Sequence, residues 1–548
     1  SPKEGLPIMV VDEDIYRRPP ALLIATVDKF AQMPWKGEVQ MLFGQVNGAC
    51  PRHGFLSPDL ADTGKHPARG GLPGTKRQPH GPLRPPDLII QDELHLISGP
   101  LGSMVGLYES AVDELCSWTV AEQRVRPKVI ASTATIRRAA DQVKKLYVRQ
   151  LAVFPPQGTT LHNNFFALHR PPGPDYPGRR YLGLCAIGRR YPATLIRVYL
   201  AFLGAAQALY EKYDHHADPW MTLTGYFNSI RELAGTRRLV DDDIRSRLRH
   251  ADQRGLAKRF IPAVEELTSR KSGTDIPRIL ERLDIGFDQA RLQQREADRK
   301  AGKKPLPPLP YDVILATNMI SVGVDIARLG LMVVAGQPKT TAEYIQATSR
   351  VGRSNAGPGL VCTVYNWARP RDLSHYETFA HYHDTFHQHV EALSLTPFAA
   401  RALDRGLSGV MVGLLRLWEE RLNPNLAAGA LTDQEPLLTQ VFDHLIQRAQ
   451  NATDSTAVAD QVRQALHIRR DEWLKRVHHA TDHHLGYQST GDGVVGLLQQ
   501  PKVGDWALYT CLNALRDVED SIPLLLDTND YNLRVGGVAP SMPSVNCA

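Results

Sequence analysis

The sequence contains little cysteine: six residues in 548, none of them paired as C-x-x-C. Such scattered cysteines do not form the framework of a disulfide-stapled protein, and they fit a reducing compartment. We find no run of about 18 apolar residues, so we expect no membrane span. The first residues, SPKEGLPIMVVDED, have neither the basic nor the apolar region of a signal peptide. We therefore expect a cytoplasmic protein without a membrane partner.

A large excess of charge of one sign is also absent. The formal net charge is +6, which permits a polyanionic partner but does not demonstrate one. Hydrophobic residues make up 43% of the chain and charged residues 22%, as in an ordinary globular protein. A chain of 548 residues is long enough for about two to four domains with cores of their own.

Short apolar runs alternate with helical patterns along the first two thirds of the chain, which predicts parallel sheets covered by helices. We expect an α/β protein with two such regions, residues 1–155 and 156–370, followed by a mainly helical region, 371–548. PALLIATVDKFA (Pro20–Ala31) is interpreted as a strand and a helix, and Val240–Lys304 as a charged helical insertion. The stretch 51–86 is rich in Gly, Pro and basic residues and is interpreted as a long surface loop.

The stretch DLIIQDELHLIS ends an apolar strand with two carboxylates, Asp92 and Glu93. At the carboxyl edge of a sheet, one carboxylate can hold hydrated Mg²⁺ and the next can polarise a water that attacks a phosphate. A phosphate-binding loop of the G-x-x-x-x-G-K-[ST] type does not occur before Asp92. Taken alone, the stretch could equally be an exposed acidic loop.

Two further strand ends carry hydroxyls. STAT (Ser132–Thr135) could hydrogen-bond the Asp92 loop, or Thr133 or Thr135 could simply cap the next helix. In ILATNMISVGVDI, Thr317 and Gly323 could face phosphates and Asp325 a ribose hydroxyl. A buried strand followed by a turn is the alternative for this second segment.

The segment YIQATSRVGRS places Gln346, Arg350 and Arg353 at positions i, i+4 and i+7. A helix would align these three on one face, and arginine is suited to multidentate recognition of phosphate. A surface face of ion pairs is the alternative. We also interpret Gly352 as a sign that the helix is shaped near its end.

The order of these segments, with Thr26-x-Asp28 before them and TGYFNSIRE (Thr224–Glu232) between STAT and the GVDI segment, resembles the motif series of superfamily 2 helicases. The resemblance covers roughly residues 15 to 370. It implies two RecA-like domains that clamp ATP between them and hold nucleic acid across their tops. The sequence departs from the family pattern in the Pro51–Pro86 insertion and in Ser349, where glycine is usual.

The resemblance implies ATP and Mg²⁺ as cofactors. By it, Asp92 binds Mg²⁺ through water, Glu93 activates the attacking water, and Gln346, Arg350 and Arg353 lie at the nucleotide, the arginines as fingers. The remaining implied roles are nucleotide contacts by His95, Gly323 and Asp325, nucleic-acid backbone contacts by Thr26, Ser229 and Thr317, and coupling between the domains by Gln91, Thr133 and Thr135.

The flanking segments QDELHLISGPLGSMVGLYE, FPPQGTTLHNNFFA, HVEALSLTPFAARALDRGL and LNALRDVEDSI resemble the DrmA helicase subunits of DISARM antiphage systems. That resemblance implies an ATP-driven helicase or translocase on DNA with a single-stranded region, working with a DrmB-like partner. It also implies a phosphate-binding segment upstream of these 548 residues. A nucleotide-free scaffold with a helicase fold and an RNA-directed helicase are the alternatives.

Metal-type and basic segments are also present. Cys50 and His53 in CPRHGF have a metal-like spacing, with His66 and His80 nearby, but a tetrahedral zinc site needs four ligands. A plain loop is the simpler interpretation, and zinc stays the alternative. We interpret the histidines of His375–His389 as a packing face and the basic stretch Pro177–Tyr181 as a solvated loop.

Overall fold

The computed structural model divides the chain into two compact units, which we describe separately. The first unit comprises Ser1–Ser132, Ala139–Leu151 and Ser394–Ala548, and the second comprises Thr133–Arg138 and Ala152–Leu393. Within residues 8–518, the structure describes all positions except 61–63, 72, 134–136, 157, 161–162, 164, 167, 169, 273, 305, 319–324, 355–356, 433, 481–483, 492 and 502–503.

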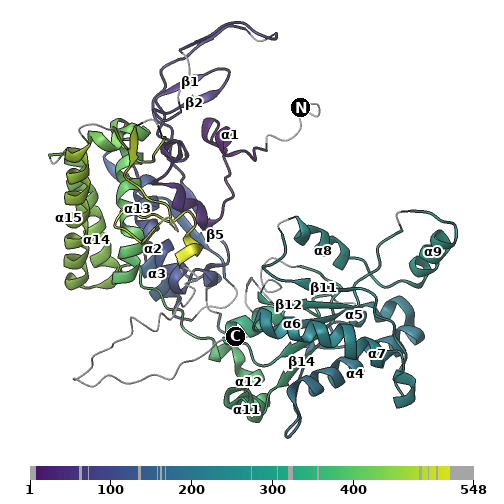
Figure 1. Ribbon diagram of the computed structural model, residues 1–548. Helices are drawn as coiled ribbons and strands as arrows, with labels where there is room; N and C mark the ends of the chain where they lie inside the picture. Colours follow the sequence, from purple (N-terminus) through teal and green to yellow (C-terminus); the bar gives the residue numbers. More distant parts are fainter. Residues whose placement is uncertain are drawn as a thin grey trace, which may run out of the picture. The chain divides into compact units, whose positions relative to one another are not determined.

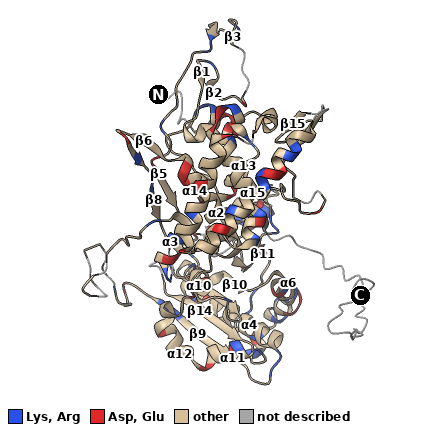
Figure 2. Cartoon of the chain, turned by 90° about the vertical axis from the view of Figure 1, so that its left-hand side faces the viewer, with Lys and Arg blue, Asp and Glu red and all other residues tan. Residues whose placement is uncertain are grey.

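A six-stranded parallel sheet forms the centre of the second unit (Figure 1), with strand order β11-β12-β10-β13-β14-β9. Its strands are β9 (Arg179–Cys185), β10 (Leu223–Phe227), β11 (Val264–Leu267), β12 (Val313–Ala316), β13 (Leu331–Ala335) and β14 (Gly359–Tyr365). The central strands are buried and uncharged, so β10 and β14 are drawn wholly in tan in Figure 2. Near-continuous apolar strands are what a sheet covered on both faces requires.

Helices cover both faces of this sheet, and each face has its own hydrophobic core. Leu195, Tyr199 and Leu203 of α4 (Tyr191–Tyr213) pack into one core, whereas Tyr344 and Ala347 pack into the other. The other helices of the unit are α5 (Asp218–Met221), α6 (Ile230–Leu239), α7 (Arg245–Leu248), α8 (Asp275–Leu283), α9 (Gln289–Lys300), α10 (Thr341–Thr348), α11 (Pro370–Glu377) and α12 (Phe379–Thr385). The architecture confirms the predicted α/β class.

One helical stretch, Tyr191–Met221, is long and apolar enough to cross a membrane by length and composition alone. Half of its most apolar window is buried inside the protein, where α4 packs on the sheet. A core helix of this length passes the same test, so the stretch is weak evidence for a membrane span. The expected absence of a membrane partner stays a prediction.

Two sequence-based assignments of secondary structure were wrong. The predicted strand in Pro20–Ala31 does not form: Leu22 and Ile24 are exposed, and only Val27–Gln32 forms a short 3-10 helix. Conversely, the predicted helical insertion 240–304 contains the edge strand β11, with sequence VEEL. Its two glutamates hid the strand pattern, because an edge strand leaves half of its surface open to charged side chains.

The first unit contains a parallel pair of strands, β5 (Leu88–Gln91) and β8 (Lys128–Ala131), and the buried helix α2 (Gly99–Leu115). Helix α13 (Ala400–Trp418) crosses α2 so closely that Gly409 has no room for a Cβ beside the Tyr108 hydroxyl. The other main helices of the first unit are α1 (Asp12–Arg17), α3 (Ala139–Tyr147), α14 (Pro436–Thr453) and α15 (Thr456–His479). The C-terminal helices therefore share a unit with residues 1–132, whereas the sequence suggested a separate region from residue 371.

Several short strands also belong to the first unit. The predicted 51–86 loop contains parts of two antiparallel hairpins, which the sequence did not reveal. The short strands are β1 (Gly48–Cys50), β2 (Gly54–Leu56), β3 (Lys65–His66), β4 (Thr75–Lys76), β6 (Trp118–Val120), β7 (Gln123–Val125), β15 (His484–Gly486) and β16 (Val494–Gly496).

The buried ion pair of Arg259 with Asp312, 3.0 Å apart, fixes the start of β12 in the second unit. We expect Asp312→Ala to lower the free energy of unfolding by about 3–5 kcal/mol, because Arg259 would remain buried without its carboxylate. Asp252, exposed and paired with Lys258, is the matched control, and Asp252→Ala should leave stability almost unchanged. Urea unfolding measures both, and equal effects would contradict the prediction.

Glu109 of α2 should make stability depend on pH. Burial raises the pKa of Glu109 from 4.5 to about 7, although the Arg448 charge opposes the rise. Between these values unfolding releases a proton, so the stability that Glu109 contributes is present below pH 4.5 and is lost as pH rises through 7.

Glu109→Gln removes this titration. We expect the stability difference between wild type and Glu109→Gln to shift by up to about 3 kcal/mol across that window, to the disadvantage of wild type at the higher pH. Urea unfolding at a series of pH values measures the shift. A difference that stays constant with pH would contradict the burial of an ionisable Glu109.

Candidate functional site

The Asp92–His95 loop begins at the carboxyl end of β5, beside the end of its parallel neighbour β8. Asp92 is exposed, and its Oδ1 accepts hydrogen bonds from the Glu93 backbone N–H (3.0 Å) and the Ser132 hydroxyl. The loop is also joined to β8 by backbone bonds, Ser132 N–H to Gln91 C=O and Leu94 N–H to Ser132 C=O. Asp92 is thus held at the sheet edge where α/β proteins bind ligands.

Glu93 has a left-handed backbone conformation, with φ 52° and ψ 48°. Such a conformation costs a residue with a Cβ about 1 kcal/mol or more, and in folded proteins it clusters at functional sites. The carboxylate of Glu93 lies 3.3 Å from Nδ1 of His95, whose side chain is buried. The strained backbone and the imidazole together fix the direction of the Glu93 side chain.

A side chain of α3 holds the turn after Glu93 through hydrogen bonds. Nε2 of the buried Gln142 donates to the carbonyls of Leu94 (3.2 Å) and Ile97 (2.8 Å). The side chain of Gln91 donates to the Asp92 carbonyl at 2.8 Å. Gln91 therefore acts locally in the described structure, and its predicted coupling role stays a prediction.

Ser132 contacts the Asp92 loop, although it was not among the residues predicted to couple the domains. The predicted coupling residues are Thr133 and Thr135, but the hydroxyl that reaches Asp92 belongs to Ser132. The prediction that a hydroxyl of STAT bonds the Asp92 loop is thus confirmed with a different residue. Thr135 lies outside the described residues, and no role of Thr133 is tested.

In the second unit, the predicted residues lie at two opposite edges of the sheet. Ser229 follows β10 and Thr317 follows β12, so both lie at the carboxyl edge. The segment after α10 is bonded to the amino edge instead, since Gly352 N–H donates to the Leu329 carbonyl, just before β13. The structure therefore separates the predicted nucleic-acid contacts from the predicted arginine fingers.

The predicted helical alignment of the arginines is wrong. Helix α10 ends at Thr348, so Gln346 is helical and buried, whereas Arg350 and Arg353 lie in the following turn. Gly352 has φ 66°, and a Cβ there would collide with the backbone of Gly359 at the start of β14. Position 352 does require glycine. The reason is the turn formed by residues 349–353, which carries Arg350 and Arg353 and is called the arginine turn below, and not the end of a helix.

Arg179, the first residue of β9, positions this turn. Its Nε donates to the Val351 carbonyl (2.8 Å) and its Nη2 to the Ser349 carbonyl (3.3 Å). The interpretation of Pro177–Tyr181 as a solvated loop is therefore wrong for Arg179. No sequence signal separated it from its neighbour Arg180, because the contact spans about 170 residues of chain.

The other predicted site residues have local partners. Arg353 forms an ion pair with the exposed Asp325, the Ser229 hydroxyl caps α6 by accepting from the Glu232 N–H (3.2 Å), and Thr317 is buried beside Asn318. Thr26 is exposed at the start of a 3-10 helix. Gly323 lies outside the described residues.

In the histidine-rich segment 375–389, His383 packs as expected, whereas His381, His387 and His389 are exposed. His383 lies among aromatic rings, 4.0 Å between ring centroids from Phe379 and 4.9 Å from Tyr181, and its Nε2 is 2.9 Å from the Tyr344 hydroxyl. Burial lowers the pKa of His383. These contacts confirm the packing interpretation for His383.

We expect Arg179→Ala to loosen the arginine turn. Loss of two hydrogen bonds to Ser349 and Val351 should speed hydrogen exchange of peptides spanning 349–354 by about tenfold. Arg179→Lys should not restore protection, because one ammonium cannot reproduce the guanidinium fork. Arg180→Ala, an exposed neighbour on the same strand, is the matched control, and faster exchange in that variant as well would contradict a specific role for Arg179.

Comparison with known proteins covers most of the chain. Residues 266–355, within the second unit, match the helicase conserved C-terminal domain family. The chain is 42% identical over 479 residues to the DISARM protein DrmA of Bacillus paralicheniformis, which covers 86% of this chain and 40% of that protein. The chain thus spans well under half the length of this curated relative.

Similar solved structures are more distant. The DUF1998 helicase MrfA, bound to DNA and AMPPNP, is 15% identical, with 73% of this chain and 42% of that chain covered and a TM-score of 0.45. The Mycobacterium smegmatis helicase Lhr, bound to ssDNA and AMP-PNP, is 13% identical, with 83% and 42% covered and a TM-score of 0.43. The resemblance predicted from the motifs is confirmed: residues 266–355 match the helicase conserved C-terminal domain family, and the chain is similar over most of its length to the DISARM protein DrmA.

Proposed function

We propose that this chain supplies the magnesium-binding and water-activating loop and the arginine fingers of an ATP-dependent superfamily 2 DNA helicase or translocase. We further propose that the intact protein works in DISARM-type antiphage defence, as its similarity to DrmA suggests. The observation that carries the proposal is the loop of Asp92 and Glu93, held at a parallel sheet edge with a strained Glu93.

The donor set of this loop fits hydrated Mg²⁺ with ATP. The two described hydrogen bonds to the Asp92 carboxylate both reach Oδ1, which leaves Oδ2 for water of a hydrated Mg²⁺. ATP and Mg²⁺ together would supply a phosphoryl group activated for attack. Glu93, turned by its left-handed backbone and by His95, would take the proton of the attacking water.

The arginine turn suits recognition of transition-state charge. Arg353 pairs with Asp325, so a nucleotide phosphate would replace one anion by another at the same guanidinium. Arg350 precedes it in the turn that Arg179 holds. Ser229 and Thr317, at the other edge of the sheet, would contact the nucleic-acid backbone without reading its sequence.

A phosphate-binding lysine is the part of this chemistry that the 548 residues do not provide. We propose that a G-K-[ST] loop elsewhere in the intact protein supplies it, since the chain covers 40% of the relative's length. We also propose DNA with a single-stranded region, a DrmB-like partner subunit and a cytoplasmic location.

We expect Glu93→Gln in the intact protein to bind ATP but to lose nearly all DNA-stimulated hydrolysis, because the amide cannot accept the water proton. Arg350→Ala or Arg353→Ala should lower turnover by about 10³-fold or more, as loss of an arginine finger does. Steady-state phosphate release and nucleotide binding to each variant separate the two effects.

Glu122→Gln is the matched control, since Glu122 is an exposed glutamate of the first unit that also has a positive φ of 68°. Its turnover should equal that of wild type. Unchanged hydrolysis in Glu93→Gln would overturn the role of Glu93. Loss of ATP binding in that variant would show that the loop is structural rather than catalytic.

A further inference from the structure

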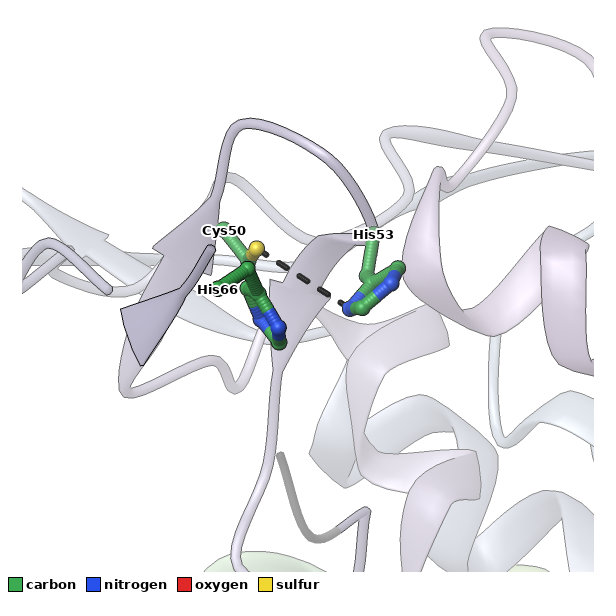
Figure 3. A group of neighbouring side chains, drawn as sticks. All are labelled: Cys50, His53 and His66. Atoms are coloured by element: carbon green, nitrogen blue, oxygen red, sulfur yellow. Dashed lines mark hydrogen bonds between the residues drawn. The ribbon is translucent and has the colours of Figure 1, made fainter. Parts of the chain in front are cut away.

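Three side chains of types that can bind metals come together at the start of the 51–86 insertion of the first unit: Cys50 directly before it, and His53 and His66 within it. The ligand atoms of Cys50, His53 and His66 all lie within 4.8 Å of one another, and Cys50 Sγ is 4.0 Å from His53 Nδ1. Figure 3 shows the Cys50 sulfur directed toward the ring of His53, with the ring of His66 beside it. Of the described residues, only these three form such a group.

Two neighbouring hairpins supply the three side chains of this cluster. Cys50 ends β1, His53 lies in the turn before β2, and His66 belongs to β3. Gly54, paired with Cys50 across the hairpin, has φ 97° and leaves no room for a Cβ beside the Arg17 carbonyl. The Cys-x-x-His spacing on a tight β-turn thus turns both ligand side chains to the same side.

Contacts outside the cluster hold the third ligand in place. Arg52, in the turn itself, donates to the carbonyls of Pro67 (3.1 Å) and Pro73 (3.0 Å), on both sides of the β3–β4 connection. Ala49 exchanges two backbone hydrogen bonds with Gln78, at 2.8 and 2.9 Å. The hairpin and β3 are therefore joined by contacts that do not involve the three ligands.

The chemistry of the ligand set favours one class of metal. One thiolate and two imidazoles suit Zn²⁺ and related borderline metals, whereas Mg²⁺ and Ca²⁺ prefer oxygen. In a tetrahedral zinc site the ligand atoms lie about 3.5 Å apart, given bonds of about 2.0–2.3 Å. The cluster would contract to that geometry from a Cys50 Sγ–His53 Nδ1 separation of 4.0 Å and from separations of at most 4.8 Å among all three ligand atoms.

We propose that Cys50, His53 and His66 bind one Zn²⁺ ion, with water as the fourth ligand, and that this ion fastens the β1–β2 hairpin to β3. On binding, the Cys50 thiol releases its proton to solvent as the zinc–sulfur bond forms, and both imidazoles bind as neutral bases. The site is independent of the proposed ATP chemistry at Asp92 and Glu93, so either proposal can fail without the other.

Metal content of the intact protein, purified without a histidine tag, tests the proposal. We expect about one zinc ion per chain by plasma mass spectrometry, and loss of most of it in Cys50→Ser and in His66→Ala. His80→Ala and Cys185→Ser are the matched controls, one an exposed histidine of the same insertion and the other a cysteine of the second unit. Both should keep the full zinc content.

Cobalt substitution of the wild-type protein gives a second measurement, which does not depend on whether the variants fold. Co²⁺ bound to the wild-type protein should show a thiolate-to-cobalt charge-transfer band and the visible bands of tetrahedral coordination. His66→Cys should keep the metal and strengthen the charge-transfer band. Wild-type protein that takes up neither zinc nor cobalt, or zinc content that is equal in Cys50→Ser and His80→Ala, would overturn the proposal.

Discussion

The first unit depends on the ion pairs that the buried carboxylate of Asp113 forms with arginines. This carboxylate accepts from guanidinium groups of Arg126 (2.6 Å), Arg149 (2.7 Å) and Arg448 (3.1 Å). Burial alone would raise the pKa of Asp113, but the three arginine charges outweigh burial and hold the pKa below its ordinary value. One ionised side chain thereby joins α2, the segments after β7 and α3, and the C-terminal helix α14.

This arrangement explains why the C-terminal helices belong to the same unit as the Asp92 loop. Helix α2 follows that loop directly and is buried along most of its length, partly by α13. A buried ion cluster is stable only when every charge has a partner, so α2, α3 and α14 are fixed together. The loop before α2 is consequently built on a rigid base, as a site for chemistry needs.

The second unit carries two groups of predicted site residues at opposite edges of one sheet. Its carboxyl edge carries Ser229 and Thr317, and its amino edge carries the turn with Arg350 and Arg353. A sheet buried on both faces has a densely packed core of low compressibility, which holds its two edges at a fixed distance from each other. In the proposed motor, nucleotide and nucleic acid would contact the same rigid unit at different edges.

The sequence by itself determined the α/β class and the two carboxylates at the end of β5. These follow from local apolar patterns, which need only the few residues of each strand. Strand β11 was not predicted, because its edge position admits glutamates. The predicted strand in Pro20–Ala31 does not form, because an apolar run forms a strand only beside a partner.

Tertiary structure decided the rest. The contact of Ser132 with Asp92 and the contacts of Arg179 with the arginine turn join segments 40 and 172 residues apart, and the meeting of His66 with Cys50 and His53 depends on how two hairpins pack. A local pattern carries no information about which distant carbonyl or carboxylate a side chain will meet. The sequence therefore indicated the kinds of groups the protein would use, and the packing of strands and helices decided which individual residues meet.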